Sequence, residues 1–167
     1  MDIISHGLWG AAPSYAKGKR SSWWLAFLFG VMPDAVSFGW TFVMAIFVEG
    51  GFKMGDRPHS MENIPSLTFT LYNITHSLFI FVIVFGAVYL LRKRKLFWPL
   101  AAWGLHIIMD IPTHSFEFFP TPFLWPVSQF KVDGISWGQP WFMAVDISAL
   151  LVVYLILYVR RKKRAAR

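Results

Sequence analysis

The sequence contains no cysteine, and this absence excludes several kinds of chemistry at once. Disulfide bonds, thiolate metal ligands and a cysteine nucleophile are all impossible, so any metal site must use His, Asp and Glu. No Gly-x-Ser-x-Gly elbow occurs, no serine stands in a recognisable triad pattern, and no phosphate-cradling glycine loop is present. Metal-activated water is therefore the expected nucleophile if the protein is a hydrolase.

Charge is also scarce. Only 15% of the 167 residues are charged, whereas 56% are hydrophobic and 19% aromatic. A soluble domain has about a quarter of its residues charged, so the composition predicts one membrane-embedded domain over residues 1–167. The net charge of +7 does not predict a nucleic-acid partner, because the basic residues form short runs beside apolar stretches. The N-terminus has no basic n-region, so we expect no cleaved signal peptide.

Four apolar stretches predict an all-α, polytopic membrane protein with about four transmembrane helices. A hydrocarbon core about 30 Å thick takes roughly 20 helical residues. The stretches run from about Ser22 to Val48, Leu67 to Leu91, Leu96 to Met109, and Trp141 to Val159. The third meets Asp110 and Pro112, so it either stops inside the membrane or unwinds there. The segments Glu49 to Ser66 and Ile111 to Pro140 are expected to be ordered loops on one side.

The distribution of Lys and Arg predicts the orientation, because cytoplasmic loops retain basic residues. Thirteen of the sixteen are expected on one side: Lys17, Lys19, Arg20, Arg92 to Lys95, Arg160 to Arg164, and Arg167. The other three are Lys53, Arg57 and Lys131. This split predicts a multi-pass protein of the inner (cytoplasmic) membrane, with a basic cytoplasmic tail from about residue 160.

Five ionisable residues fall inside or beside these apolar segments: His6, Asp34, His76, His106 and Asp110. At 1.5 Å per helical residue, counted from the basic clusters, they lie about 17 to 24 Å deep. His6 reaches this depth if its segment is a short helix that re-enters from the cytoplasmic face, although such a helix could also be interfacial. An ionisable group at this depth is usually paired, metal-bound or functional.

These residue types favour a divalent cation, most consistently zinc. His106 and Asp110 are four residues apart and share one helical face, although an unmetallated His and Asp pair is the alternative. Asp34 follows Pro33, so it is either a ligand on an unwound turn or the N-cap of a second half-helix. His76 is either a ligand or an interfacial residue at a helix mouth, and His6 is either a supporting ligand or a surface residue.

Several further residues have open roles. His114 could be another ligand or a general acid, and Asp34 or Asp110 could orient the attacking water if not bound to metal. Glu117 could support the site or be only a loop charge. Asp146 could take part in the site or be a water-facing cap, and His59 is expected to be solvent-exposed.

The motifs His6-Gly-Leu, Pro33-Asp34, Thr75-His76-Ser77 and Leu124-Trp125-Pro126, together with Gly104-Leu-His106-Ile-Ile-Met-Asp110-Ile-Pro-Thr113, resemble the YdjM-like family of membrane-bound metal-dependent hydrolases. The resemblance covers most of the chain and implies a small helical membrane protein whose His and Asp residues bind metal. The His-x-x-x-Asp element is also similar to one in the zinc-dependent phospholipase C group.

The chain departs from the family pattern in two places. Ala-Val-Ser follows Asp34 where many members have a further Asp and His, which removes possible ligands for a second metal. Asn73 stands where many have Arg, which weakens any phosphate clamp.

The sequence thus predicts a membrane-embedded metal-dependent hydrolase that cleaves a lipid or lipid-linked ester or phosphoester from the outer-leaflet side. A metal-stabilised membrane scaffold and a small transporter are the alternatives. A transporter would need polar residues that continue toward the cytoplasm, yet Phe79 to Leu91 and Leu150 to Val159 are almost wholly apolar. This favours an enzyme or a structural site over a conduit.

Overall fold

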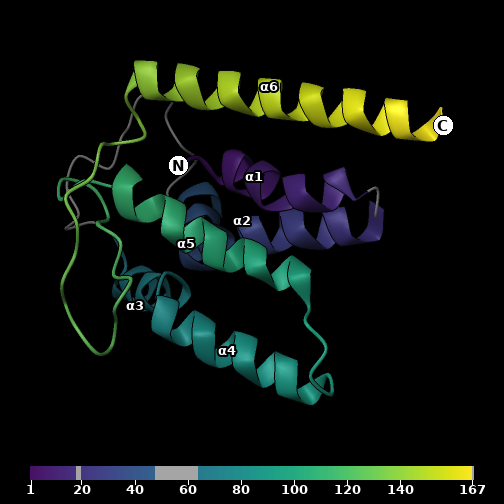
Figure 1. Cartoon of the computed structure of the whole chain (residues 1–167). Helices are drawn as coiled ribbons and strands as arrows, with labels where there is room; N and C mark the ends of the chain where they lie inside the picture. Colours follow the sequence, from purple (N-terminus) through teal and green to yellow (C-terminus); the bar gives the residue numbers. More distant parts are fainter. Residues whose placement is uncertain (18–19, 48–63, 167) are drawn as a thin grey trace.

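The computed structural model describes residues 1–17, 20–47 and 64–166, and these residues form helices, turns and loops with no strand (Figure 1). The expected loop Glu49 to Ser66 lies mostly outside the described residues, as does His59. The helices are α1 (Ile3–Ala16), α2 (Arg20–Phe47), α3 (Ser66–Thr75), α4 (Leu78–Leu91), the 3₁₀ turn η2 (Trp98–Leu100), α5 (Ala101–Thr113) and α6 (Pro140–Ala165). The predicted all-helical fold is thus confirmed for the described part.

Two helices are long and apolar enough to cross a membrane on their own. These are residues Ser22–Val43 of α2 and the helix Pro140–Ala165. A third candidate is the pair α3 and α4, which is bent by 57° at the break between them. The segment predicted from Leu96 contains a short helix, α5, whose 13 residues reach only about 20 Å. The predicted count of four spans is therefore not confirmed, whereas membrane-like apolar helices are.

α1 is an inner helix of the fold. Asp2 caps it by accepting hydrogen bonds from the backbone N–H groups of Ile4 and Ser5, each at 3.0 Å. α1 packs closely against α2 at Gly30. A Cβ added at Gly30 would lie 2.6 Å from the carbonyl oxygen of His6. Since His6 is 1% exposed, the alternative of a surface histidine is wrong.

α2 is a continuous helix through Pro33. The prediction of an unwound turn at Asp34 is therefore wrong, and so is the alternative of an N-cap on a second half-helix. Pro33 removes one helical N–H but leaves the helix unbroken. The carbonyl oxygen of Pro33 accepts a hydrogen bond from the buried hydroxyl of Ser37 at 2.7 Å. Asp34 thus projects from an intact helix.

The basic residues that the structure describes in the three clusters lie at one end of the molecule. In Figure 1 the end of α1, the end of α4 and the C-terminus lie at the same end, opposite the long loop between α5 and α6. Contacts between elements join the clusters: the Lys17 ammonium lies 5.6 Å from the ring centroid of Trp98, and the Arg161 guanidinium lies 5.6 Å from that of Tyr15. α6 remains helical through its basic tail to Ala165.

The loop between α5 and α6 is tied to the end of α5 by backbone hydrogen bonds. The N–H groups of Gly134, Ile135 and Trp137 donate to the last carbonyls of α5 and its cap, at 2.8, 2.8 and 3.0 Å. These bonds satisfy carbonyl groups that a helix end leaves without partners. The expected loop is present over residues 114–139, whereas residues 111–113 belong to α5 and Pro140 begins α6; His114 lies at the start of the loop.

Candidate metal centre

Four predicted ligands come together from three parts of the fold. Asp34 projects from α2, His76 lies at the break between α3 and α4, and His106 and Asp110 are one turn apart on α5. One ligand atom from each of the four lies within 4.8 Å of all the others. His76, His106 and Asp110 are buried, whereas the Asp34 side chain is 15% exposed. Asp34 is thus the most exposed member of the group.

Contacts of the Nδ1 atoms of His76 and His106 orient the two rings so that their Nε2 atoms face the centre of the group. The Nδ1 atom of His106 is 2.7 Å from the carbonyl oxygen of Gly30, and that of His76 is 3.2 Å from the carbonyl oxygen of Tyr72. A carbonyl can only accept, so the Nδ1 atom of His106 donates to Gly30. The Nδ1 atom of His76 is also 2.9 Å from the Thr75 hydroxyl, and it donates in the tautomer that pairs with the Tyr72 carbonyl. In a neutral imidazole the Nε2 atom then carries a lone pair. The two Nε2 atoms are 3.0 Å apart.

Two carboxylates complete this electron-rich group. Asp34 Oδ1 lies 3.4 Å from His76 Nε2 and 3.8 Å from His106 Nε2. Asp110 Oδ2 lies 3.5 and 3.1 Å from the same two atoms. In a tetrahedral zinc site with bonds of about 2.0 to 2.2 Å, neighbouring ligand atoms are about 3.3 to 3.6 Å apart. The observed separations bracket this range, so the donor set fits one small divalent cation.

The other oxygen of Asp110 faces a second set of groups. His6 Nε2 lies 2.8 Å from Asp110 Oδ1, the α-amino group of Met1 donates to it at 2.9 Å, and His114 Nδ1 lies 3.3 Å away. The His6 ring also stacks on the His106 ring, with centroids 3.7 Å apart. His6 is thus beside the four-residue group and contacts it through Asp110.

Several buried polar atoms in and beside the group have no hydrogen-bond partner, which is consistent with a bound cation. Both ring nitrogens of His6 and Oδ2 of Asp110 have no hydrogen-bond partner of acceptable geometry, although such atoms are rarely left unsatisfied. α1 lies outside the candidate spans, and burial lowers the pKa of His6 to about 4 against the opposing effect of Asp110. A neutral imidazole retains the lone pair that metal binding requires.

The break that presents His76 is stabilised by tertiary contacts. Ser77 caps α4 by accepting from the backbone N–H of Ile80 at 3.1 Å, and its hydroxyl donates to the carbonyl oxygen of Trp125. The indole N–H of Trp103 donates to the carbonyl oxygen of Thr75 at 2.6 Å. Interrupted backbone is tolerated at membrane depth only where other groups satisfy it. His76 is fully buried among these elements and is not exposed at the helix mouth.

Asp146 holds α6 against α1. Its carboxylate accepts hydrogen bonds from the Ser5 hydroxyl at 2.6 Å and from the Trp9 indole at 2.8 Å. The residue is buried, so the alternative of a water-facing cap is wrong. It supports the site indirectly, because Ser5 precedes His6 on α1. This pairing joins residues 141 positions apart, and no local sequence pattern indicates it.

The remaining predicted residues are placed as follows. His114 is buried at the end of α5 and contacts Asp110, whereas Glu117 is exposed in the loop, as expected of a loop charge. Sequence reasoning missed the groups that orient the histidines, which are the carbonyls of Gly30 and Tyr72. Backbone groups carry no sequence signal, although a glycine facing α1 is consistent with a close crossing.

The chain was compared with protein-family models, with curated proteins and with solved structures, and none of them matches.

Proposed function

We propose that this protein is a membrane-embedded, metal-dependent hydrolase, with a divalent cation held by Asp34, His76, His106 and Asp110. The observation that supports this most strongly is the 3.0 Å separation of two Nε2 atoms whose Nδ1 atoms both face carbonyls. Two lone pairs at this distance repel each other unless a cation or a proton lies between them. A metal ion would also compensate the charge of the Asp34 carboxylate, whereas Asp110 is already paired with the α-ammonium of Met1.

Zinc is the proposed metal. Two imidazoles and two carboxylates are ligands that zinc accepts, whereas calcium prefers six to eight oxygen ligands and half of this donor set is nitrogen. The His-x-x-x-Asp element and the resemblance to metal-dependent membrane hydrolases support the same choice. His6 supports the ligand Asp110 from the other side.

The proposed reaction is hydrolysis of a lipid or lipid-linked ester or phosphoester. When bound, the cation would lower the pKa of the bound water toward neutrality and polarise the bond to be cleaved. The partly exposed Asp34 would orient the water if it does not itself bind the metal, and His114 would protonate the leaving group. The contact of His114 with Asp110 and the hydrogen bond from the Gly134 N–H to the His114 carbonyl support this role.

We further propose that the protein lies in the inner membrane with its basic end in the cytoplasm. The three basic clusters meet at one end of the molecule, and the metal centre lies toward the other end, where α5 finishes and α3 meets α4 (Figure 1). The substrate would then enter from the outer leaflet. A third transmembrane crossing by α3 and α4, and a fourth by η2 and α5, belong to this proposal.

The proposal is tested by turnover. Metal-loaded protein in vesicles is incubated with a panel of phospholipids and polyprenyl phosphates, and products are followed by mass spectrometry. Metal-dependent cleavage that is lost in Asp34→Asn and kept in the exposed control Glu117→Gln supports the enzyme. A tightly bound metal whose removal unfolds the protein, with no substrate cleaved, supports the scaffold instead.

A further inference from the structure

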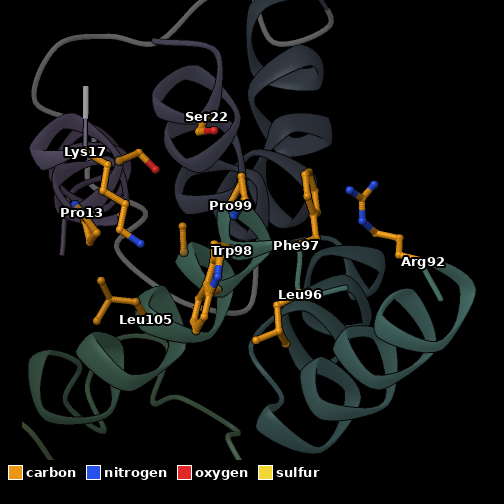
Figure 2. Close-up of a pocket in the computed structure, with 13 residues that line it drawn as sticks. Pro13, Lys17, Ser22, Arg92, Leu96, Phe97, Trp98, Pro99 and Leu105 are labelled. Atoms are coloured by element: carbon orange, nitrogen blue, oxygen red, sulfur yellow. The ribbon is translucent and has the colours of Figure 1, made fainter. Parts of the chain in front are cut away.

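A separate pocket opens at the basic end of the molecule, away from the metal centre. Its volume is about 660 Å³, and it is formed by the end of α1, the start of α2, the end of α4 and the turn that leads into α5. Figure 2 shows the Lys17 side chain reaching toward Trp98, with Arg92 on the far side of Phe97. None of the proposed metal ligands lines this pocket.

The pocket is positively charged. Lys17 and Arg92 line it, and no acidic residue does so among the residues that the structure describes. Each cation lies against an aromatic ring: the Lys17 ammonium is 5.6 Å from the Trp98 centroid, and the Arg92 guanidinium is 4.9 Å from the Phe97 centroid. These contacts hold the side chains at the pocket without neutralising them. The hydroxyl groups of Ser14 and Ser22 also line the pocket.

The rest of the lining is apolar and open to the surroundings. Leu96 is 45% exposed and Trp98 is 61% exposed, and Leu105 extends the apolar lining along α5. A tryptophan at the end of an apolar helix is typical of the membrane–water interface. A free inorganic anion would use the cations but would have no use for these apolar groups. An amphiphile with a negatively charged head would use both.

We propose that this pocket binds the phosphate headgroup of an anionic phospholipid, from the leaflet that faces the basic end. Lys17 and Arg92 supply the positive charge that attracts the phosphate, and Leu96 and Trp98 contact the glycerol and the first acyl carbons. Basic pockets between membrane helices bind phospholipid headgroups in this way. Arg161 and Arg164, which contact Tyr15 and the carbonyl of Ala16, add to the local positive potential.

The test uses full-length protein reconstituted in nanodiscs that contain equal amounts of phosphatidylglycerol and phosphatidylcholine. Lipid that remains bound after extraction is measured by native mass spectrometry. The wild type is expected to retain phosphatidylglycerol preferentially, and Lys17→Gln with Arg92→Gln is expected to lower its retention about tenfold or more. The control Lys162→Gln with Lys163→Gln removes the same charge from the exposed tail and should retain the lipid.

Size-exclusion chromatography shows whether each variant is folded, and the charge-preserving pair Lys17→Arg with Arg92→Lys should keep the lipid preference. Equal retention of the two lipids by the wild type would overturn the proposal, as would an equal loss in the tail control. Displacement of the lipid by millimolar inorganic phosphate alone would show that the pocket takes a free anion.

Discussion

His76 and His106 face each other across 3.0 Å with their Nε2 atoms, although they lie 30 residues apart in the chain. Each ring is oriented from behind by a backbone carbonyl, that of Tyr72 for His76 and that of Gly30 for His106. Metal-binding histidines are commonly oriented in this way, by a hydrogen bond from the ring nitrogen that does not bind the metal. The packing of α2 against α5 therefore determines the orientation of His106, one of the proposed metal ligands.

The first prediction concerns that packing. Gly30→Ala places a methyl group 2.6 Å from the carbonyl oxygen of His6, and α1 must move away from α2. We expect a loss of about 1 to 3 kcal/mol in unfolding free energy, measured by denaturation in detergent. Gly39→Ala on the same helix is the control, because a Cβ there meets nothing within 4 Å. Equal effects of the two substitutions would show that the close crossing does not matter.

The second prediction concerns the attachment of α6. Asp146→Ala leaves the Ser5 hydroxyl and the Trp9 indole without their acceptor. Each unsatisfied buried group costs about 1 to 3 kcal/mol, so the melting temperature should fall clearly. Ser148→Ala, at an exposed position of the same helix, should change it little. A melting temperature unchanged in Asp146→Ala would contradict the proposed role.

The third prediction concerns His114. If this residue protonates the leaving group, His114→Ala should lower turnover about 100-fold or more, with metal content unchanged. Glu117→Gln in the same loop serves as a matched control and should retain activity. Loss of the metal in His114→Ala would instead assign His114 to the ligands, and unimpaired turnover would remove it from the mechanism.

The fourth prediction concerns topology. α6 is by itself long and apolar enough to span the membrane. Reporters placed in the loop of residues 111–140 and after Arg164 should therefore lie on opposite sides. The tail reporter is expected in the cytoplasm because of its basic residues. The two reporters on the same side would refute a membrane crossing by α6.

Much of the candidate site could be predicted because membrane depth is additive along a helix. Counting from the basic clusters placed Asp34, His76, His106 and Asp110 at similar depths, and the structure brings all four together. The i, i+4 spacing of His106 and Asp110 also set them on one face of α5. Residue type and depth are properties that a single segment carries, so the sequence alone reveals them.

The rest depends on contacts between distant segments. The stretch Leu67 to Leu91 is apolar enough to suggest one straight helix, yet it is broken beside His76, where Ser77 and Thr75 bond to Trp125 and Trp103. The opposite error occurred at Pro33, where a proline suggested a break and the helix continues. Local propensity decided neither case, because tertiary partners satisfied the backbone differently at the two sites.

The central claim is that the four-residue group binds a metal, and elemental analysis of the purified protein tests it most directly. A stoichiometric amount of a divalent metal, zinc foremost, should accompany the wild type and be largely lost in Asp110→Asn and in His106→Gln. Their melting temperatures should fall as well, because binding to the folded state stabilises it by about 2.7 kcal/mol at a hundredfold excess over Kd. Ser148→Ala should keep the metal. Wild-type protein without metal after growth and purification in added zinc, or unchanged metal content in both ligand variants, would contradict the account.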